Sequence, residues 1–321
     1  MGASNGCASC GCSQKCCGDQ QDADPTLKVV GTREAPKKDP VTENGAEAHF
    51  LSYFEREIPE LRTVKSSGSG QRPRYTFKTG ATYTGQWQGN ARHGYGTQRW
   101  PDGAVYQGEW RHNFAEGKGR FLHTDGDSYI GEWRSNVAHG VGAYYHQNLT
   151  SYKGQWFEDL QDGYGVEAWA EGTRFEGRFK GGHKQGHGIY FWPDGSMYCG
   201  TWELNTINGH GKYTGFDGRL FQGTWQDEVI HGRGKYTWPN GREYSGQYYF
   251  DRKEGFGVFV WPDGRMYEGF WYQGRQHGHG KSTLKNGSVR YALWRDGVQE
   301  RNDKDEKQDE SADQANTALE D

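Results

Sequence analysis

Residues 80–103 read GATYTGQWQGNARHGYGTQRWPDG, and the chain repeats this pattern over most of its 321 residues. Each of nine copies begins with an aromatic anchor, has a glycine two residues later and a second aromatic residue two further on, and continues to a Gly-x-Gly pair. The anchors recur every 23 residues without a slip, at Tyr83, Tyr106, Tyr129, Tyr152, Phe175, Tyr198, Phe221, Tyr244 and Tyr267. A constant period of this length is typical of a repeat array.

One copy is expected to form a β-hairpin. Tyr83, Gly85 and Trp87 alternate with polar residues, which places all three on one face of a strand. The glycine leaves a slot between the rings that a ring of the adjoining hairpin can fill. A second strand is expected around residues 94–96, after a loop of about six residues, and Trp-Pro-Asp-Gly at residues 100–103 predicts a tight turn.

A lone hairpin is marginal in water, so the hairpins are expected to stack. We expect an all-β fold, an elongated single-layer antiparallel sheet of stacked β-hairpins over residues 73–297, with nine full repeats and a degenerate tenth. Eighteen strands about 4.8 Å apart predict a rod of roughly 85–100 Å. The composition agrees, because 32% of the residues are hydrophobic while 15% are aromatic. The tenth copy, with Arg290 at the anchor position and Trp294 retained, is expected to cap the array.

The skeleton Y-x-G-x-W, spacer, G-x-G and closing D-G resembles the MORN (membrane occupation and recognition nexus) repeat family. The resemblance implies a MORN solenoid that links membranes to other structures, as MORN arrays do in junctophilins and in protist cortical cytoskeletons. Some MORN families append a SET methyltransferase or a phosphoinositide kinase domain, but neither flank here is long enough for one, so no enzyme is expected. The resemblance also implies a possible homodimer through terminal repeats, where exposed edge strands favour pairing.

The aromatic ladder is expected to form the core and, where neighbours leave rings uncovered, an apolar groove for a protein partner. The candidate partner-binding residues are Tyr83, Trp87, Tyr106, Trp110, Tyr129, Trp133, Tyr152, Trp156, Tyr198, Trp202, Trp225, Tyr244, Tyr267 and Trp271. Two copies add apolar residues beside the ladder as further candidate contacts, namely Phe157 and Leu160 in the fourth and Tyr248, Tyr249 and Phe250 in the eighth.

Residues 1–18 form a second informative segment. Gly2, exposed once Met1 is removed, is a candidate for myristoylation, although Gly6 stands where the motif has Ser or Thr. A second acyl chain is needed for stable anchoring, and the candidates for palmitoylation are Cys7, Cys10, Cys12, Cys16 and Cys17. The alternatives are a zinc site, a disulfide knot or unmodified thiols. Lipidation is favoured, because no second ligand pair and no secretory signal accompany these cysteines.

Residues 19–72 are expected to be mostly a disordered tether that carries one short amphipathic helix at about residues 45–58, ended by Pro59. The apolar face of this helix suits a staple over the first hairpin, or else a helix that binds a partner or a membrane. Residues 65–71 are interpreted as a flexible linker, and residues 298–321 as an acidic disordered tail.

Charge and motif patterns exclude several functions. The array carries 26 Lys and Arg against 23 Asp and Glu, too small an excess to indicate nucleic acid, and it gives little support to direct binding of anionic lipid. His93, His139, His231 and His277 recur at one position of the hairpin and are interpreted as turn residues. A metal site needs three or four donors at one point, so no metal and no cofactor is expected.

These expectations combine into a non-enzymatic scaffold that acyl chains hold at the cytoplasmic face of a plasma membrane or cortical membrane. The rod would link that membrane to a protein partner or a cytoskeletal assembly. Two alternatives stay open. One is an axonemal or cortical structural protein that resembles the radial-spoke-head MORN proteins, and the other is a recruiting subunit for a kinase or methyltransferase.

Overall fold

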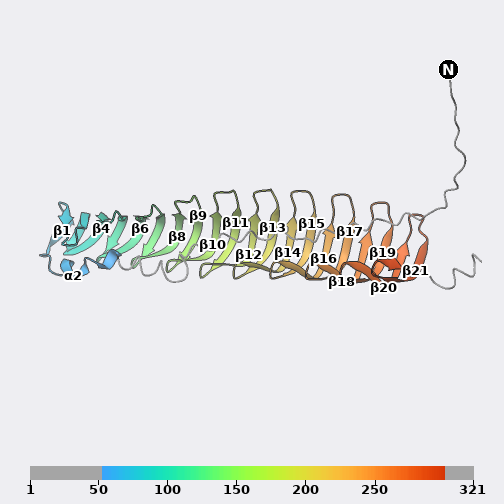
Figure 1. Cartoon of the computed structure of the whole chain (residues 1–321). Coiled ribbons are helices and arrows are strands. Elements are labelled where there is room, and N and C mark those ends of the chain that lie inside the picture. Colours follow the sequence, from blue (N-terminus) through green and yellow to red (C-terminus); the bar gives the residue numbers. More distant parts are fainter. Residues whose placement is uncertain (1–52, 301–321) are drawn as a thin grey trace, which may run out of the picture.

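The computed structural model describes residues 53–300, which form one antiparallel sheet of 22 strands and a short helix, α2 (Ile58–Leu61). Hairpin follows hairpin along a rod, as the colour gradient in Figure 1 shows. The expected all-β fold of stacked hairpins is therefore confirmed. The rod also carries strands outside the nine full repeats.

The flanking strands are β1 (Ser67–Gln71), β2 (Tyr75–Thr76), β21 (Val289–Arg295) and β22 (Val298–Gln299). The nine repeats supply two strands each, namely β3 (Thr82–Gly89), β4 (Ala91–Arg99), β5 (Val105–Arg111), β6 (Phe114–Leu122), β7 (Ser128–Arg134), β8 (Val137–Tyr145), β9 (Ser151–Phe157), β10 (Leu160–Ala168), β11 (Arg174–Lys180), β12 (His183–Phe191), β13 (Met197–Glu203), β14 (Thr206–Thr214), β15 (Leu220–Gln226), β16 (Val229–Thr237), β17 (Glu243–Tyr249), β18 (Arg252–Val260), β19 (Met266–Tyr272) and β20 (Arg275–Thr283).

The two strands of a repeat meet at a short turn. In the second repeat His112 and Asn113 have φ values of 49° and 76°, the left-handed pair of a type I′ turn, which matches the twist of the strands. The expected loop of about six residues was wrong, because most of those residues continue the strands. The turn at residues 100–103 is confirmed, since the N–H of Gly103 donates to the carbonyl oxygen of Trp100 at 3.1 Å.

A bulge in each second strand accounts for that difference. In the first repeat Gly85 pairs with Gly96 but Trp87 pairs with Arg92, so β4 uses more residues than β3 over the same length. Gly94 lies in the bulge with a φ of 72°, a backbone conformation that residues other than glycine rarely adopt. The bulge lets the second strand begin close to the turn while the glycines of the two strands stay in register.

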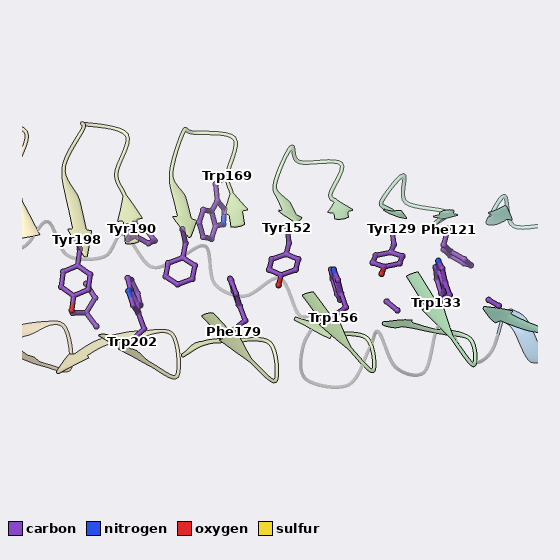
Figure 2. Close-up of a cluster of buried hydrophobic side chains, with 14 of the residues drawn as sticks. Phe121, Tyr129, Trp133, Tyr152, Trp156, Trp169, Phe179, Tyr190, Tyr198 and Trp202 are labelled. Atoms are coloured by element: carbon purple, nitrogen blue, oxygen red, sulfur yellow. The ribbon is translucent and has the colours of Figure 1, made fainter. Parts of the chain in front are cut away.

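The strands bend at their central glycines, and the sheet folds lengthwise into two facing walls. Residues four apart in a flat strand are about 13 Å apart. The ring centroids of Tyr83 and Trp87 are instead 5.1 Å apart, with the ring planes at 89°. Figure 2 shows the same arrangement farther along, where Tyr152 points from one wall toward Trp156 on the other. We call these the tyrosine wall and the tryptophan wall.

A pair of glycines makes the bend possible. A Cβ atom on Gly85 would lie 2.5 Å from the Cα of Gly96, and a Cβ atom on Gly96 would lie 2.3 Å from the hydroxyl oxygen of Tyr83. The slot expected beside the glycine is therefore present. The ring that fills it is the anchor of the same hairpin, however, and not a ring of the adjoining hairpin as expected.

The sheet extends beyond the expected limits of the array at both ends. Ser67–Gln71 forms β1, antiparallel to β3, where a flexible linker was expected. Val298–Gln299 forms β22 on β21, where the tail was expected to begin. Both strands form hydrogen bonds with backbone N–H and C=O groups that an edge strand would otherwise leave unpaired. Backbone pairing of this kind requires no side-chain pattern, so the sequence showed no sign of it.

The tenth copy closes the ladder of rings as expected of a cap. Trp294 in β21 lies 5.5 Å from Tyr267 of the ninth repeat, with the ring planes at 81°. Tyr291, which stands one place after the lost anchor, points outward and is 74% exposed. The degenerate copy therefore keeps the one ring that the preceding repeat needs.

The N-terminal helical segment ends differently from the expectation. Residues 53–55 are helical and α2 follows, with Pro59 in the first turn of α2 instead of after the last turn of a helix. Proline fits there because the first N–H groups of a helix have no partner within the helix. Residues 45–52 of the expected helix lie outside the described residues.

Candidate functional site

The two walls interlock through a ladder of rings. Each anchor ring lies edge-to-face against the second aromatic residue of its own repeat and against that of the next. Tyr106 is 4.9 Å from Trp110 and 5.3 Å from Trp133, and the ring planes meet at 86° and 84°. The same contact joins Tyr244 and Trp271 at 5.2 Å. Edge-to-face geometry is favourable for aromatic pairs, so the ladder ties each repeat to its neighbour.

The anchor tyrosine hydroxyls and several indole N–H groups of the ladder pair with the backbone, whereas the indole N–H groups of Trp87, Trp202 and Trp225 do not. The hydroxyl of Tyr83 donates to the carbonyl oxygen of Gln86 at 2.8 Å, and the indole N–H of Trp110 donates to the carbonyl oxygen of Gly96 at 3.2 Å. Burial raises the pKa of the phenols, for example to about 12 at Tyr267. These phenols therefore stay neutral across the physiological pH range.

The ladder is the core of the protein. Its members expose at most 9% of their surface, and they include Tyr83, Trp87, Tyr106, Trp110, Tyr129, Trp133, Tyr152, Trp156, Tyr198, Trp202, Trp225, Tyr244, Tyr267 and Trp271. A buried ring offers almost no area to a second molecule, so direct contact would require the walls to part. Partner binding through these residues stays a prediction, and it would require the two walls to separate.

Residues 53–61 pack against both walls at one end of the rod. The ring of Phe54 is fully buried, 5.1 Å from Tyr106 of the second repeat and 5.6 Å from Trp133 of the third. This agrees with the interpretation of the segment as a staple. The staple reaches the third repeat, whereas only the first hairpin was expected to be covered.

A buried network holds this segment in place. The guanidinium of Arg92 donates to the carbonyl oxygen of Phe54 at 3.0 Å and to the side-chain oxygen of Gln98 at 2.6 Å. Gln98 in turn donates to the carboxylate of Glu57 at 3.0 Å. Burial raises the pKa of Glu57, with Arg92 opposing the shift, and burial lowers the pKa of Arg92 to about 10. Removing one charge would leave the other buried without compensation, which is costly.

Buried cations recur at the position of Arg92, nine residues after the anchor, in two other repeats. In the fifth repeat the ammonium of Lys184 lies 2.7 Å from the carboxylate of Glu167. In the eighth repeat the ammonium of Lys253 lies 5.2–5.5 Å from the centres of four rings. The sequence reasoning missed these inward-facing cations. The signal was their shared place in the repeat, at a position that Ala, Ile or Gln holds in the other copies.

On the outer surface, a hydrogen bond between a side chain and the backbone recurs at the bend. In five of the nine repeats the side chain of the third residue after the anchor accepts a hydrogen bond from the N–H of the residue between the Gly-x-Gly glycines. Gln86 accepts from Tyr95 at 2.9 Å, and Gln247 accepts from Phe256 at 3.1 Å. The same bond is formed by Glu109, Gln155 and Thr224. This residue therefore caps the bulge.

Phe270 cannot form this hydrogen bond in the ninth repeat. Its side chain has no acceptor atom, and it packs edge-to-face on Phe256, its cross-strand neighbour, with ring centroids 5.8 Å apart. Both residues are 52% exposed, and Tyr249, Phe250 and Tyr272 of the same two hairpins are 48–57% exposed. We call these five residues the outer aromatic patch. The sequence reasoning missed Phe270, whose signal is that all eight other full copies have a polar residue at that place.

The apolar residues singled out in the fourth and eighth copies divide into two groups. Phe157, Tyr249 and Phe250 are exposed. Tyr248 is buried with 4% exposure, because it is the second aromatic residue of its repeat and belongs to the ladder. Leu160 is half-buried at the start of β10. Tyr248 is therefore a core residue, and two of the three exposed residues lie in the eighth repeat.

The recurrent histidines are strand residues, so their interpretation as turn residues was wrong. They lie in β4, β8, β16 and β20, where the strands begin closer to the turn than expected: His93, His139, His231 and His277. Between residues 53 and 300 no three His, Cys, Asp or Glu side chains gather as they would around a metal ion. In the same part of the chain no helix has the length and apolar character needed to cross a bilayer.

The candidate lipidation residues lie outside the described residues, so their modification stays a prediction. They are Gly2, Cys7, Cys10, Cys12, Cys16 and Cys17.

Sheet and ladder together define a β-hairpin repeat protein, in which each unit shares its aromatic core with its neighbours. The MORN repeat model matches nine segments that together make up more than half of the chain: residues 83–105, 106–128, 129–150, 152–174, 175–197, 198–218, 221–241, 244–264 and 267–289. The chain therefore belongs to the MORN repeat family. No curated protein sequence matches it.

Solved structures with some likeness to this sheet are TCP domains. The TCP10 domain of CPAP from Danio rerio, in complex with a peptide of Danio rerio STIL, is 12% identical over 72% of this chain and 99% of that chain, with a TM-score of 0.39. The SAS-4 (dCPAP) TCP domain of Drosophila melanogaster, in complex with a proline-rich motif of Ana2 (dSTIL), is 15% identical over 56% of this chain and 90% of that chain, with a TM-score of 0.32. TM-scores this low carry no functional argument.

Proposed function

We propose that this chain is a non-enzymatic scaffold, anchored at the cytoplasmic face of a membrane, whose rod presents a surface to a protein partner. The observation that carries the proposal is the buried ladder. It places the ladder rings of nine repeats in the core, which leaves the outer surface of the rod for contact with a partner. Solenoids of stacked repeats provide long surfaces of this kind for partners.

Anchoring rests on Gly2 and the five cysteines within residues 7–17. A single myristoyl chain binds a membrane only marginally, whereas two acyl chains hold a protein stably. The repeats themselves carry too small an excess of basic residues to attract an anionic membrane strongly. The acyl chains would therefore supply the attachment, and the rod would supply the contact with the partner.

Membrane flotation of the full chain expressed in eukaryotic cells tests the anchoring. Wild type is expected to float with membranes, and both Gly2→Ala and the variant with all five early cysteines changed to serine are expected to stay in the soluble fraction. Cys199→Ser is the matched control, because Cys199 is an exposed cysteine in the array and far from the acylation segment in sequence. Membrane association that survives in both test variants would show the anchoring mechanism to be wrong.

A further inference from the structure

The outer aromatic patch has features of a binding surface. A phenyl or phenol side chain has roughly 150–250 Å² of surface, so five such residues that are about half exposed present on the order of 400–600 Å². That is the upper end of the largest apolar patch on a typical monomer, and such patches are often functional. The patch gathers on two adjacent hairpins, β17–β18 and β19–β20.

The patch also lacks a side-chain cap on the bulge that five other repeats have. At the place of Phe270, Gln247 and the equivalent residues of four other repeats cap the bulge through a side-chain oxygen. Phe270 gives up that hydrogen bond and exposes a ring instead. Natural proteins depart from such local patterns mainly at functional or strained sites.

Two arginines border the patch. Arg252 is the direct cross-strand neighbour of Tyr249, and Arg275 is that of Tyr272. Both arginines are exposed, and within residues 53–300 neither forms an ion pair. The acidic neighbour Glu254 is engaged, since it accepts a hydrogen bond from the N–H of Gln273 at 3.0 Å. The two tyrosine–arginine pairs therefore offer positive charge beside apolar rings.

The distance between the two tyrosine–arginine pairs indicates the spacing of the groups on a ligand that would contact them. Equivalent positions in consecutive repeats are two strands apart, about 9–10 Å. A polyproline II segment has three residues per turn and advances about 3.1 Å per residue, so residues three apart project from one face about 9 Å apart and match that spacing. Carboxylates at such positions could each meet one arginine in the two-pronged geometry that guanidinium and carboxylate groups favour.

Charge decides between the possible occupants. In a two-fold contact between copies centred on this patch, Arg252 and Arg275 of one copy would face those of the other, which is repulsive. Attraction to an anionic membrane is typical of clusters of about four to eight basic residues, and here only two arginines border the rings. An acidic protein segment matches both the charge and the apolar rings.

We propose that the outer aromatic patch docks an acidic segment of a partner protein in the polyproline II conformation, with carboxylates three residues apart at Arg252 and Arg275 and an apolar side chain on the Phe256–Phe270 pair. This rests on the proposed scaffold function and gives the surface and the chemistry of its partner. The contact lies on the outside of the walls and leaves the buried ladder closed.

Fluorescence anisotropy of the full chain in solution tests the proposal, with a set of synthetic twelve-residue peptides that carry Asp or Glu at three-residue spacing and Leu or Phe between them. Phe270→Gln and Arg275→Glu are each expected to weaken binding at least about tenfold. Tyr164→Gln is the matched control, since Tyr164 is 56% exposed at the place equivalent to Phe256 in the fourth repeat, and it is expected to bind like wild type.

Several outcomes would overturn the proposal. These are no binding by any peptide of the set, equal binding to wild type and to both patch variants, or equal binding of peptides with Lys in place of the acids. Loss of binding to phosphatidylserine vesicles on Phe270→Gln, without any peptide binding, would make the patch a membrane contact instead. Peptide binding in solution needs no acyl chain, so this experiment and the flotation experiment fail independently.

Discussion

The ring of Tyr198 in the sixth repeat stands at 85° to the ring of Trp225 in the seventh, with centroids 5.6 Å apart. Trp225 in turn lies 5.2 Å from Phe221, the anchor of its own repeat. One side chain therefore completes the core of two hairpins at once. A change to a ladder residue should be felt by both repeats that share it.

Trp225→Ala is expected to lower the free energy of unfolding by about 3–5 kcal/mol, because it removes a ring that is 2% exposed and leaves a cavity between two repeats. Equilibrium unfolding in urea, followed by circular dichroism, measures the change. Tyr164→Ala, which removes an exposed ring, is the control and should change stability little. A loss below about 1 kcal/mol for Trp225→Ala would mean that the ladder is not the main source of stability.

Gly211→Ala is expected to destabilise the rod by about 1–3 kcal/mol or more, because the added Cβ would lie 2.3 Å from the hydroxyl oxygen of Tyr198. The change can be measured as a shift in the urea midpoint. Gly68→Ala is the control, since a Cβ there meets no atom within 4 Å. Equal effects at the two positions would contradict the close packing of ring on glycine.

Glu57→Gln is expected to change how stability depends on pH. Burial raises the pKa of Glu57 above its ordinary value of 4.5, so above that pH the folded chain holds a proton that the unfolded chain releases. This contribution to the free energy of unfolding is present at acid pH and falls as pH rises through the folded-state value. The stability of wild type minus that of Glu57→Gln should therefore decline with pH from 4.5 upward. A difference that rises with pH would contradict the raised pKa.

Phe270→Gln is expected to raise the free energy of unfolding by about 0.5–1.5 kcal/mol, because glutamine can cap the bulge as Gln247 does one repeat earlier. Thermal unfolding measures the gain. The reciprocal change Gln247→Phe should lower stability by removing its cap. If Phe270→Gln proved less stable than wild type, the ring would have a structural role, and its exposure would lose its significance for binding.

The sequence predicted the hairpin, its period and the turn at residues 100–103, because those follow from local patterns of Gly, Pro and alternating rings. It did not predict the length of the other turn. The bulge at Gly94 moves residues from the expected loop into the strand, and a pattern of alternation does not register such a shift.

Sites that depend on three-dimensional neighbours were harder to predict. The pairing of β1 with β3 uses backbone groups, which carry no side-chain signature. The inward direction of Lys184 and the exposure of Phe270 both follow from the bend at the central glycines, which only the close approach of the rings reveals. Both residues nevertheless stand out once the copies are aligned by their anchors.

Every anchor tyrosine or phenylalanine receives the second ring of the following repeat, so consecutive units join through the same kind of contact at each step. An in-frame duplication or loss of one 23-residue unit therefore leaves no ring unmatched and changes the length of the rod by about 9–10 Å. The length of the rod can change between related genes in steps of one repeat. The number of gene-encoded copies therefore sets the distance between the two ends of the rod.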